Sequence, residues 1–225
     1  MSAGPARPQT ATLRAEGLRV EYGPVVALHR TDLCVEPGRM LAVTGPSGAG
    51  KSSLLWALAG ALTPAAGTVS LNGNRVTGRR QAAALGVSII PQGNALSSAL
   101  TAHENVLVPL LAAGVPAREA ADRTAAALAA VGLEESGGHL VEELSGGQQQ
   151  RAAIARALAA GASVLLADEP TSDLDSANRQ RVIDELRSQA ADGAVVVMST
   201  HDPEAAAQAD AERALDEGRM TWARR

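Results

Sequence analysis

The chain has 225 residues, enough for one domain with a sizeable core, and 46% of them are hydrophobic, which excludes wholesale disorder. The formal net charge of −4 argues against a general nucleic-acid binder, and the lack of a long uncharged apolar run argues against a membrane-spanning helix. A single cysteine, Cys34, favours a reducing compartment, and no secretory signal is expected in the first residues.

Strand and helix patterns alternate along the chain. Alternating apolar residues predict a strand-rich start over 12–22, an apolar stretch covers 25–28, and short apolar runs predict strands over 40–43, 69–71, 87–90, 164–167 and 194–198. Helices are predicted over 51–60, 147–160 and 177–191, and the alanine-rich stretch 95–131 predicts helix interrupted at Pro109, Gly114 and Pro116. The last residues, around Trp222, are expected to form a frayed end. This order predicts an α/β fold with a mostly parallel sheet and an inserted helical subdomain.

The phosphate loop, residues 45–52 (GPSGAGKS), matches the pattern GxxxxGK[ST] between a buried strand and a helix. Its glycines let backbone N–H groups converge on phosphate oxygens at the helix start. Lys51 is the only lysine beside 19 arginines, and its compact ammonium suits the β- and γ-phosphates, whereas an arginine fork does not replace it. The Ser52 hydroxyl is predicted to ligate Mg²⁺. The candidate nucleotide-binding residues of this segment are Gly45, Pro46, Ser47, Gly48, Ala49, Gly50, Lys51, Ser52 and Ser53.

Two carboxylates, Asp168 and Glu169, directly follow the apolar run 164–167. Ligands of a parallel sheet bind at the carboxyl ends of its strands. Asp168 is therefore predicted to hold Mg²⁺, and Glu169 is predicted to act as general base toward an attacking water. The alternative is a solvated turn, since Asp-Glu-Pro is also a good turn sequence.

A second glycine-rich helix start, 144–148, lacks a ligand of its own within one chain. Its residues are Leu144, Ser145, Gly146, Gly147 and Gln148, and their N–H groups with the Ser145 hydroxyl form another anion-binding helix end. Two copies arranged head to tail would give each nucleotide one phosphate loop and one such helix end. The alternative is that Ser145 is a simple helix cap.

The segments GPSGAGKS, LSGGQ and LLADEP together resemble the nucleotide-binding subunit of ABC transporters, and the resemblance extends in the same order from about Leu13 to Arg219. It implies that the nucleotide is ATP and that Tyr22 stacks on adenine, although a lone tyrosine is more often a core residue. It also implies that Gln92 senses Mg²⁺ and water and that His201 senses the γ-phosphate. Pro91 departs from the aromatic residue that many members carry there. The implied catalytic residues are Lys51, Gln92, Glu169 and His201, the metal ligands are Ser52, Gln92 and Asp168, and the loop facing a partner subunit is Ser172, Asp173, Leu174 and Asp175.

The resemblance also implies how the chain is organised. A P-loop NTPase core with N-terminal antiparallel strands would span about 12–92 and 162–221, and the helical subdomain would span about 93–161. Together they would form a single ABC ATPase domain over 12–225. Residues 1–11 are expected to be disordered.

The motifs are most similar to those of the lipoprotein-releasing and macrolide-exporting branch. The branch implies ATP hydrolysis by a homodimer, or by a pair with a related ATPase subunit, that drives a separate transmembrane permease. It implies no nucleic-acid partner, membrane contact only through the permease, and a cytoplasmic location on the inner face of the cell membrane. The alternatives are a non-transport ATPase of the same superfamily and another P-loop NTPase or kinase. Against these, no heptad run separates the phosphate loop from LSGGQ, and no guanine motif NKxD is present.

Overall fold

The computed structural model describes residues 11–224, which divide into two compact units. The core unit contains 11–89, 162–169 and 186–224, and the helical unit contains 90–161 and 170–185. The disorder expected over 1–11 falls outside the described residues, except for Ala11, which is buried.

A four-stranded antiparallel sheet opens the core unit. It contains β1 (Leu13–Tyr22), β2 (Val25–Val35), β4 (Ala66–Leu71) and β5 (Asn74–Arg75) in the order β2-β1-β4-β5. The antiparallel strands expected at the N-terminus are confirmed. The apolar stretch at 25–28 proves to be the start of an eleven-residue strand. Its second half was not apparent because it alternates buried Thr31, Leu33 and Val35 with polar, exposed neighbours.

A six-stranded sheet carries the rest of the core unit. It contains β3 (Met40–Thr44), β6 (Val87–Ile90), β7 (Val164–Asp168), β8 (Val195–Thr200), β9 (Ala211–Asp216) and β10 (Arg219–Arg224) in the order β10-β9-β3-β8-β7-β6. Strand β8 pairs in parallel with both β3 and β7, and β3 pairs in parallel with β9. The mostly parallel α/β sheet is therefore confirmed.

The prediction of a frayed end around Trp222 is wrong. Strand β10 pairs antiparallel with β9, which places Trp222 opposite Arg213. The Arg213 guanidinium carbon lies 3.6 Å from the Trp222 ring centroid, a cation–π contact that helps to hold the two strands together.

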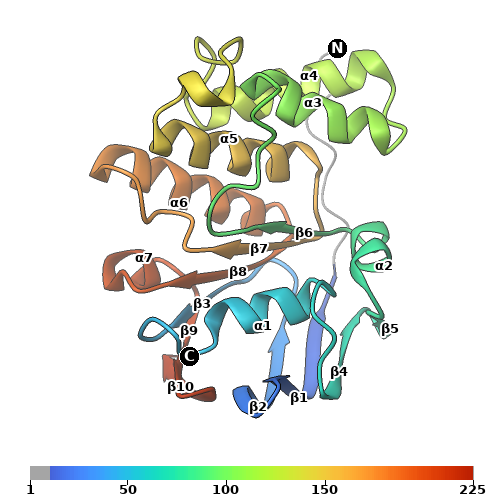
Figure 1. The fold of residues 1–225 in the computed structure, drawn as a ribbon, viewed down its shortest axis with the longest axis vertical. Coiled ribbons are helices and arrows are strands. Elements are labelled where there is room, and N and C mark those ends of the chain that lie inside the picture. The colour runs from blue at the N-terminus through green and yellow to red at the C-terminus, as the bar shows by residue number, and fades with distance from the viewer. Residues whose placement is uncertain (1–10, 225) are drawn as a thin grey trace. The chain divides into compact units, whose positions relative to one another are not determined.

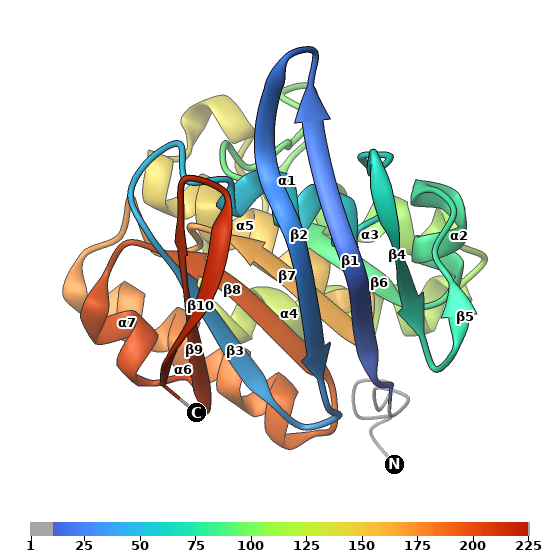
Figure 2. The same cartoon turned by 90° about the horizontal axis from the view of Figure 1, so that it is seen from below.

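Helix α1 (Lys51–Leu58) fills the space between the two sheets, as Figures 1 and 2 show. It contacts β1 and β2 of one sheet and β7 and β8 of the other. Its buried Leu54, Leu55 and Leu58 belong to one continuous hydrophobic core with strand residues of both sheets. The core unit also contains α2 (Arg79–Ala84) and α7 (Pro203–Ala207), neither of which was predicted. The central position of α1 fixes the phosphate loop that precedes it.

The helical unit contains α3 (Ala102–Ala112), α4 (Ala117–Ala130), the 3-10 turn η1 (Val141–Glu143) and α5 (Gly146–Ala159), and α6 (Ser176–Ala191) begins in it. Helices α3, α4 and α5 pack on one another (Figure 1). The break expected at Pro109 is wrong, because this residue lies inside α3 and accepts a helical bond from Ala113 N–H at 3.0 Å. A Thr101–Glu104 capping box and the burial of one face offset the bond that proline cannot make. No helix within residues 11–224 is long and apolar enough to cross a membrane.

Candidate active site

Three adjacent parallel strands bring the candidate residues of the core unit to one edge of the sheet. In the order β3-β8-β7, the strand ends lead into the phosphate loop, into His201 and into Glu169, respectively. Ser199 on β8 is in register with Val43 on one side and Asp168 on the other. The topology places these segments together although they are far apart in the sequence.

The phosphate loop has the backbone that its glycines permit. Gly45, Gly48 and Gly50 have φ values of 149°, 80° and 103°, and α1 begins immediately afterwards at Lys51. An ideal Cβ on Gly45 would lie 2.0 Å from the Leu215 carbonyl oxygen, so β9 backs the loop closely. Glycine is required at this position by both backbone angle and space.

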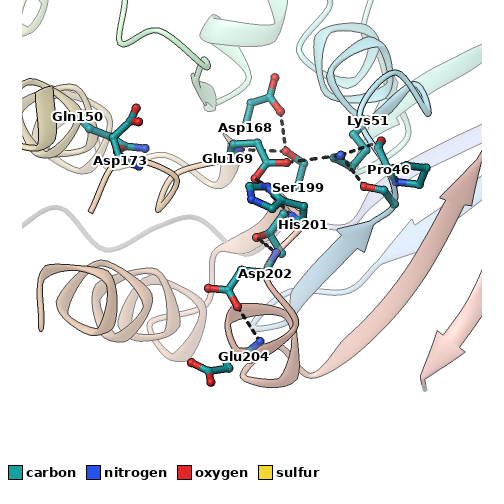
Figure 3. Close-up of polar contacts among 12 residues, drawn as sticks. Pro46, Lys51, Gln150, Asp168, Glu169, Asp173, Ser199, His201, Asp202 and Glu204 are labelled. Atoms are coloured by element: carbon teal, nitrogen blue, oxygen red, sulfur yellow. Dashed lines mark hydrogen bonds and ion pairs between the residues drawn. The ribbon is translucent and has the colours of Figure 1, made fainter. Parts of the chain in front are cut away.

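Lys51 is buried beneath this loop, with 8% of its surface exposed. Its ammonium donates to the carbonyl oxygens of Gly45 at 2.7 Å and Pro46 at 3.2 Å, and it lies 3.5 Å from a carboxylate oxygen of Glu169 (Figure 3). A charge this deeply buried requires such partners. The same oxygen-rich surroundings put the ammonium where phosphate oxygens could replace some of its present acceptors.

Glu169 joins Lys51 to His201. Its second carboxylate oxygen lies 2.8 Å from His201 Nδ1, and its first is the one beside the Lys51 ammonium (Figure 3). The side chain of Glu169 is 10% exposed whereas that of His201 is 66% exposed, so the pair leads from the interior to the surface. The alternative of a solvated Asp-Glu-Pro turn is wrong, because Asp168 and Glu169 are both buried.

The backbone of Glu169 is held in a left-handed conformation, with φ of 50°. Its N–H is directed at Ser199, 3.2 Å from the carbonyl oxygen and 3.1 Å from the hydroxyl oxygen. Non-glycine residues in this conformation cost about 1–3 kcal/mol and concentrate at functional sites. The neighbouring strand therefore holds the predicted general base in a strained position.

Asp168 suits a divalent cation. It is 2% exposed, its Oδ1 accepts from the Ser199 hydroxyl at 2.5 Å, and no basic side chain within residues 11–224 pairs with it. A buried carboxylate without a cation is costly, and Mg²⁺ prefers such oxygen ligands. No group of three or more His, Cys, Asp or Glu side chains in the described part of the chain could hold a metal. The Asp168 carboxylate thus fits an ion that takes most of its other ligands from phosphate and water.

Tyr22 is not a core residue. Its side chain ends β1 with 51% of its surface exposed, and its hydroxyl lies 3.3 Å from Ser53 Oγ of α1. The ring therefore presents an accessible face beside the helix that follows the phosphate loop.

Gln92 belongs to the helical unit and is exposed. The three residues after it, Gly93, Asn94 and Ala95, have φ values of 85°, 64° and 49°. The Arg156 guanidinium of α5 donates to the carbonyl oxygens of Asn94 at 2.9 Å and Ala95 at 2.6 Å. Arg156 stabilises this left-handed segment, a role that no local sequence pattern indicated.

The glycine-rich segment 144–148 starts α5 as expected, and Ser145 caps it. The Ser145 hydroxyl accepts from Gln148 N–H at 3.3 Å, and the Gln148 side chain accepts in return from Ser145 N–H at 2.9 Å. Gly146 and Gly147 form the first turn, where backbone N–H groups have no helical acceptor. The cap occupies one N–H group and leaves the glycine amides at the end of the helix.

The loop of Ser172, Asp173, Leu174 and Asp175 lies against α5 in the helical unit. The side chain of Gln150 accepts from Asp173 N–H at 3.3 Å, and a Cβ on Gly147 would lie 3.2 Å from Asp173 O. Hydrogen bonds from the Asn178 backbone and side chain lower the pKa of Asp175 below its usual value. The loop and the helix start are thus a joined pair of segments.

Comparisons with known proteins agree with this geometry. The family model described as ABC transporter matches residues 28–172. The chain is 42% identical to the lipoprotein-releasing system ATP-binding protein LolD of Ruegeria pomeroyi, over 93% of this chain and 97% of that protein. It is 41% identical to the macrolide export ATP-binding/permease protein MacB of Rhodopseudomonas palustris, over 88% of this chain and 32% of that protein. The dimeric ATP-binding cassette MJ0796, solved in a post-hydrolysis state bound to ADP and Pi, is similar with a TM-score of 0.86 and 29% identity, over 95% of this chain and 99% of that one.

Proposed function

Because this chain belongs to the ABC transporter family, we propose that it is an ATP-binding and ATP-hydrolysing subunit that dimerises around two ATP molecules and drives a separate transmembrane permease. The second subunit is another copy or a related ATPase. In this proposal a single ABC ATPase domain spans 12–225, with a core at about 12–92 and 162–221 and a helical subdomain at about 93–161. Of the segments assigned to the core, 90–92 and 170–185 group with the helical unit by their contacts. The chain reaches the membrane only through the permease, at the cytoplasmic face, and has no nucleic-acid partner.

Each candidate residue has a role in this proposal, and the loop of Ser172, Asp173, Leu174 and Asp175 faces the partner subunit. Lys51 and the loop amides bind the phosphates, Tyr22 stacks on adenine, and the segment 144–148 contacts the nucleotide of the partner. Glu169 accepts the proton of the attacking water, and His201 senses the γ-phosphate. Asp168, Ser52 and Gln92 hold Mg²⁺, which when bound neutralises phosphate charge.

The observation that carries the proposal is the cluster of Lys51, Glu169 and His201 at the carboxyl edge of a parallel sheet. The ammonium and the carboxylate lie 3.5 Å apart, and the carboxylate and the imidazole lie 2.8 Å apart. A phosphate-binding cation therefore lies beside a buried base with an exposed imidazole on its far side. This arrangement supports hydrolysis of a phosphoanhydride, and the signature at 144–148 supports a site completed by a second subunit.

The test removes the proton acceptor. Glu169→Gln keeps the size of the side chain, so hydrolysis is expected to fall by roughly 10² or more while ATP still binds. Since trapped ATP binds the paired form better, Mg-ATP is expected to convert this variant to a dimer in light scattering. Glu16→Gln, the same change at a side chain that is 66% exposed, is the control and should hydrolyse ATP like the wild type.

A second change separates the two parts of the proposal. Adding Ser145→Arg to Glu169→Gln places bulk and charge at the start of α5, which is expected to abolish the dimer while ATP still binds the single chain. ATP binding by this double variant also shows that it is folded. A Glu169→Gln protein that stays monomeric at saturating Mg-ATP contradicts the composite site, and wild-type hydrolysis by Glu169→Gln contradicts the assignment of the base.

A further inference from the structure

Ser199 is a buried polar residue that the proposed roles do not include. It ends the apolar run of β8 with no exposed surface. Its hydroxyl donates to Asp168 Oδ1 at 2.5 Å and accepts from Glu169 N–H at 3.1 Å (Figure 3). One hydroxyl therefore contacts both residues that the proposed function assigns to the metal and to the attacking water.

The strand register explains why the serine reaches both partners. Ser199 and Asp168 are register partners on the neighbouring parallel strands β8 and β7, so their side chains leave the same face of the sheet. The hydroxyl has one proton, and that proton goes to Asp168 because the N–H of Glu169 is itself a donor. The direction of both hydrogen bonds is thus fixed.

These two bonds constrain the site in complementary ways. The bond to Oδ1 fixes the rotation of the Asp168 carboxylate, and within residues 11–224 its Oδ2 has no hydrogen-bond partner. The bond from Glu169 N–H supports a backbone with φ of 50°, which an unsupported glutamate rarely adopts. A short hydrogen bond to a carboxylate is among the stronger ones in proteins.

We propose that Ser199 is a positioning residue that turns the free oxygen of Asp168 toward Mg²⁺ and holds the backbone of Glu169 in place for proton transfer. This inference rests on the proposed function of the same site. It requires no contact between Ser199 and the nucleotide. Removing the Ser199 hydroxyl should therefore reduce the gain in ATP affinity that Mg²⁺ produces. It should leave ATP binding by the phosphate loop in the absence of Mg²⁺ unchanged.

The experiment compares Ser199→Thr with Ser199→Val, because these side chains have nearly the same shape and differ in the hydroxyl. Binding of a fluorescent ATP analogue is measured in EDTA and again in Mg²⁺, and the ratio of the two dissociation constants gives the tightening that the metal produces. Both variants should bind like each other in EDTA. In Mg²⁺, Ser199→Val should lose about 10-fold or more of the tightening, as expected for a hydrogen bond to a charged group, whereas Ser199→Thr should keep most of it.

Steady-state hydrolysis gives a second readout. Ser199→Val should lower kcat at saturating Mg-ATP, and added Mg²⁺ should not restore it fully, because the Glu169 N–H keeps the Ser199 carbonyl oxygen as acceptor but loses the hydroxyl. Ser163→Ala is the control, since Ser163 is also buried but precedes β7 at the opposite end of that strand. This control should keep the metal-dependent tightening of the wild type.

Several results would overturn the inference. Equal Mg²⁺-dependent tightening in Ser199→Thr and Ser199→Val shows that the hydroxyl does not position the metal ligand. Loss of binding in EDTA by Ser199→Val alone assigns the hydroxyl to folding. If the added bulk prevents both variants from binding the ATP analogue, Ser199→Ala is measured in their place. Mg²⁺-dependent tightening in Ser199→Ala equal to that of the wild type then refutes the proposal. A wild-type chain without ATP hydrolysis contradicts the proposed function itself, whereas an active wild type with indistinguishable variants contradicts only the role of Ser199.

Discussion

Adding one methyl group to the phosphate loop should have very different costs at Gly45 and at Gly48. Both glycines have positive φ, 149° at Gly45 and 80° at Gly48, so alanine at either position is strained by about 1–3 kcal/mol. A Cβ on Gly48 meets no described atom within 4 Å, whereas a Cβ on Gly45 would lie 2.0 Å from the carbonyl oxygen of Leu215. That oxygen belongs to the backbone of β9, so relief requires movement of a strand.

The difference between the variants follows from this contact. Overpacking of a close-packed interior costs about 1–3 kcal/mol in addition to the backbone strain, and only Gly45→Ala incurs it. For a chain of this length, 1 kcal/mol shifts Tm by about 2–4 °C, so Gly45→Ala should unfold roughly 2–12 °C below Gly48→Ala. Gly50→Ala should resemble Gly45→Ala, because its Cβ would lie 2.2 Å from Ala27 O.

Thermal unfolding followed by far-UV circular dichroism measures these shifts on purified variants at one concentration and without nucleotide. Gly48→Ala is the control for a substitution at positive φ that meets no steric contact. A Tm of Gly45→Ala equal to or above that of Gly48→Ala would refute the close backing of the loop by β9. Lost ATP binding in Gly45→Ala would therefore reflect a loop distorted by the clash with β9.

Other predictions concern single side chains. Lys51→Arg should abolish phosphate release, because the wide guanidinium does not fit among carbonyl oxygens 2.7 and 3.2 Å from the ammonium, and wild-type turnover would contradict this. Tyr22→Ala should weaken ATP binding by roughly 1–3 kcal/mol in a calorimetric titration while Tyr22→Trp restores it, and unchanged affinity of the alanine variant would remove the stacking role. Cys34 is an exposed residue, but partial desolvation of its thiol raises the pKa of that thiol, and the hydrogen bond to Glu36 raises it further. Less thiolate is therefore present at neutral pH. Alkylation of Cys34 should therefore be slow and become faster in Glu36→Gln, and an equal or slower rate in that variant would show that Glu36 does not protect the thiol.

Short-range patterns allowed much of this molecule to be predicted. The run 164–167 has no polar residue and lies between turns, so a buried strand ending at Asp168 follows from local sequence. The phosphate loop needs its strand and its helix within a few residues of it, and all three are present around Lys51. The α/β class follows from the alternation of such segments.

Contacts that depend on strand order could not be predicted in this way. The Ser199–Asp168 pair exists because β8 lies between β3 and β7, an arrangement that no local period encodes. Strands β9 and β10 mix charged and apolar residues and are stabilised by pairing and by the Arg213–Trp222 contact. Proline in α3 is tolerated for reasons of tertiary burial. For these strands, a partner distant in sequence decides the local structure.

Because the only lysine is buried, proteolytic cleavage after it can report local opening of the folded chain. A lysine-specific protease has one possible cleavage site, after Lys51, and that bond lies at the start of a helix enclosed by two sheets. Cleavage of the folded protein therefore requires transient opening of this region, and its rate at low protease concentration gives the free energy of that opening. Titrating nucleotide against this rate would measure binding at the phosphate loop in an unlabelled, unmodified chain, with two fragments of known length as the signal.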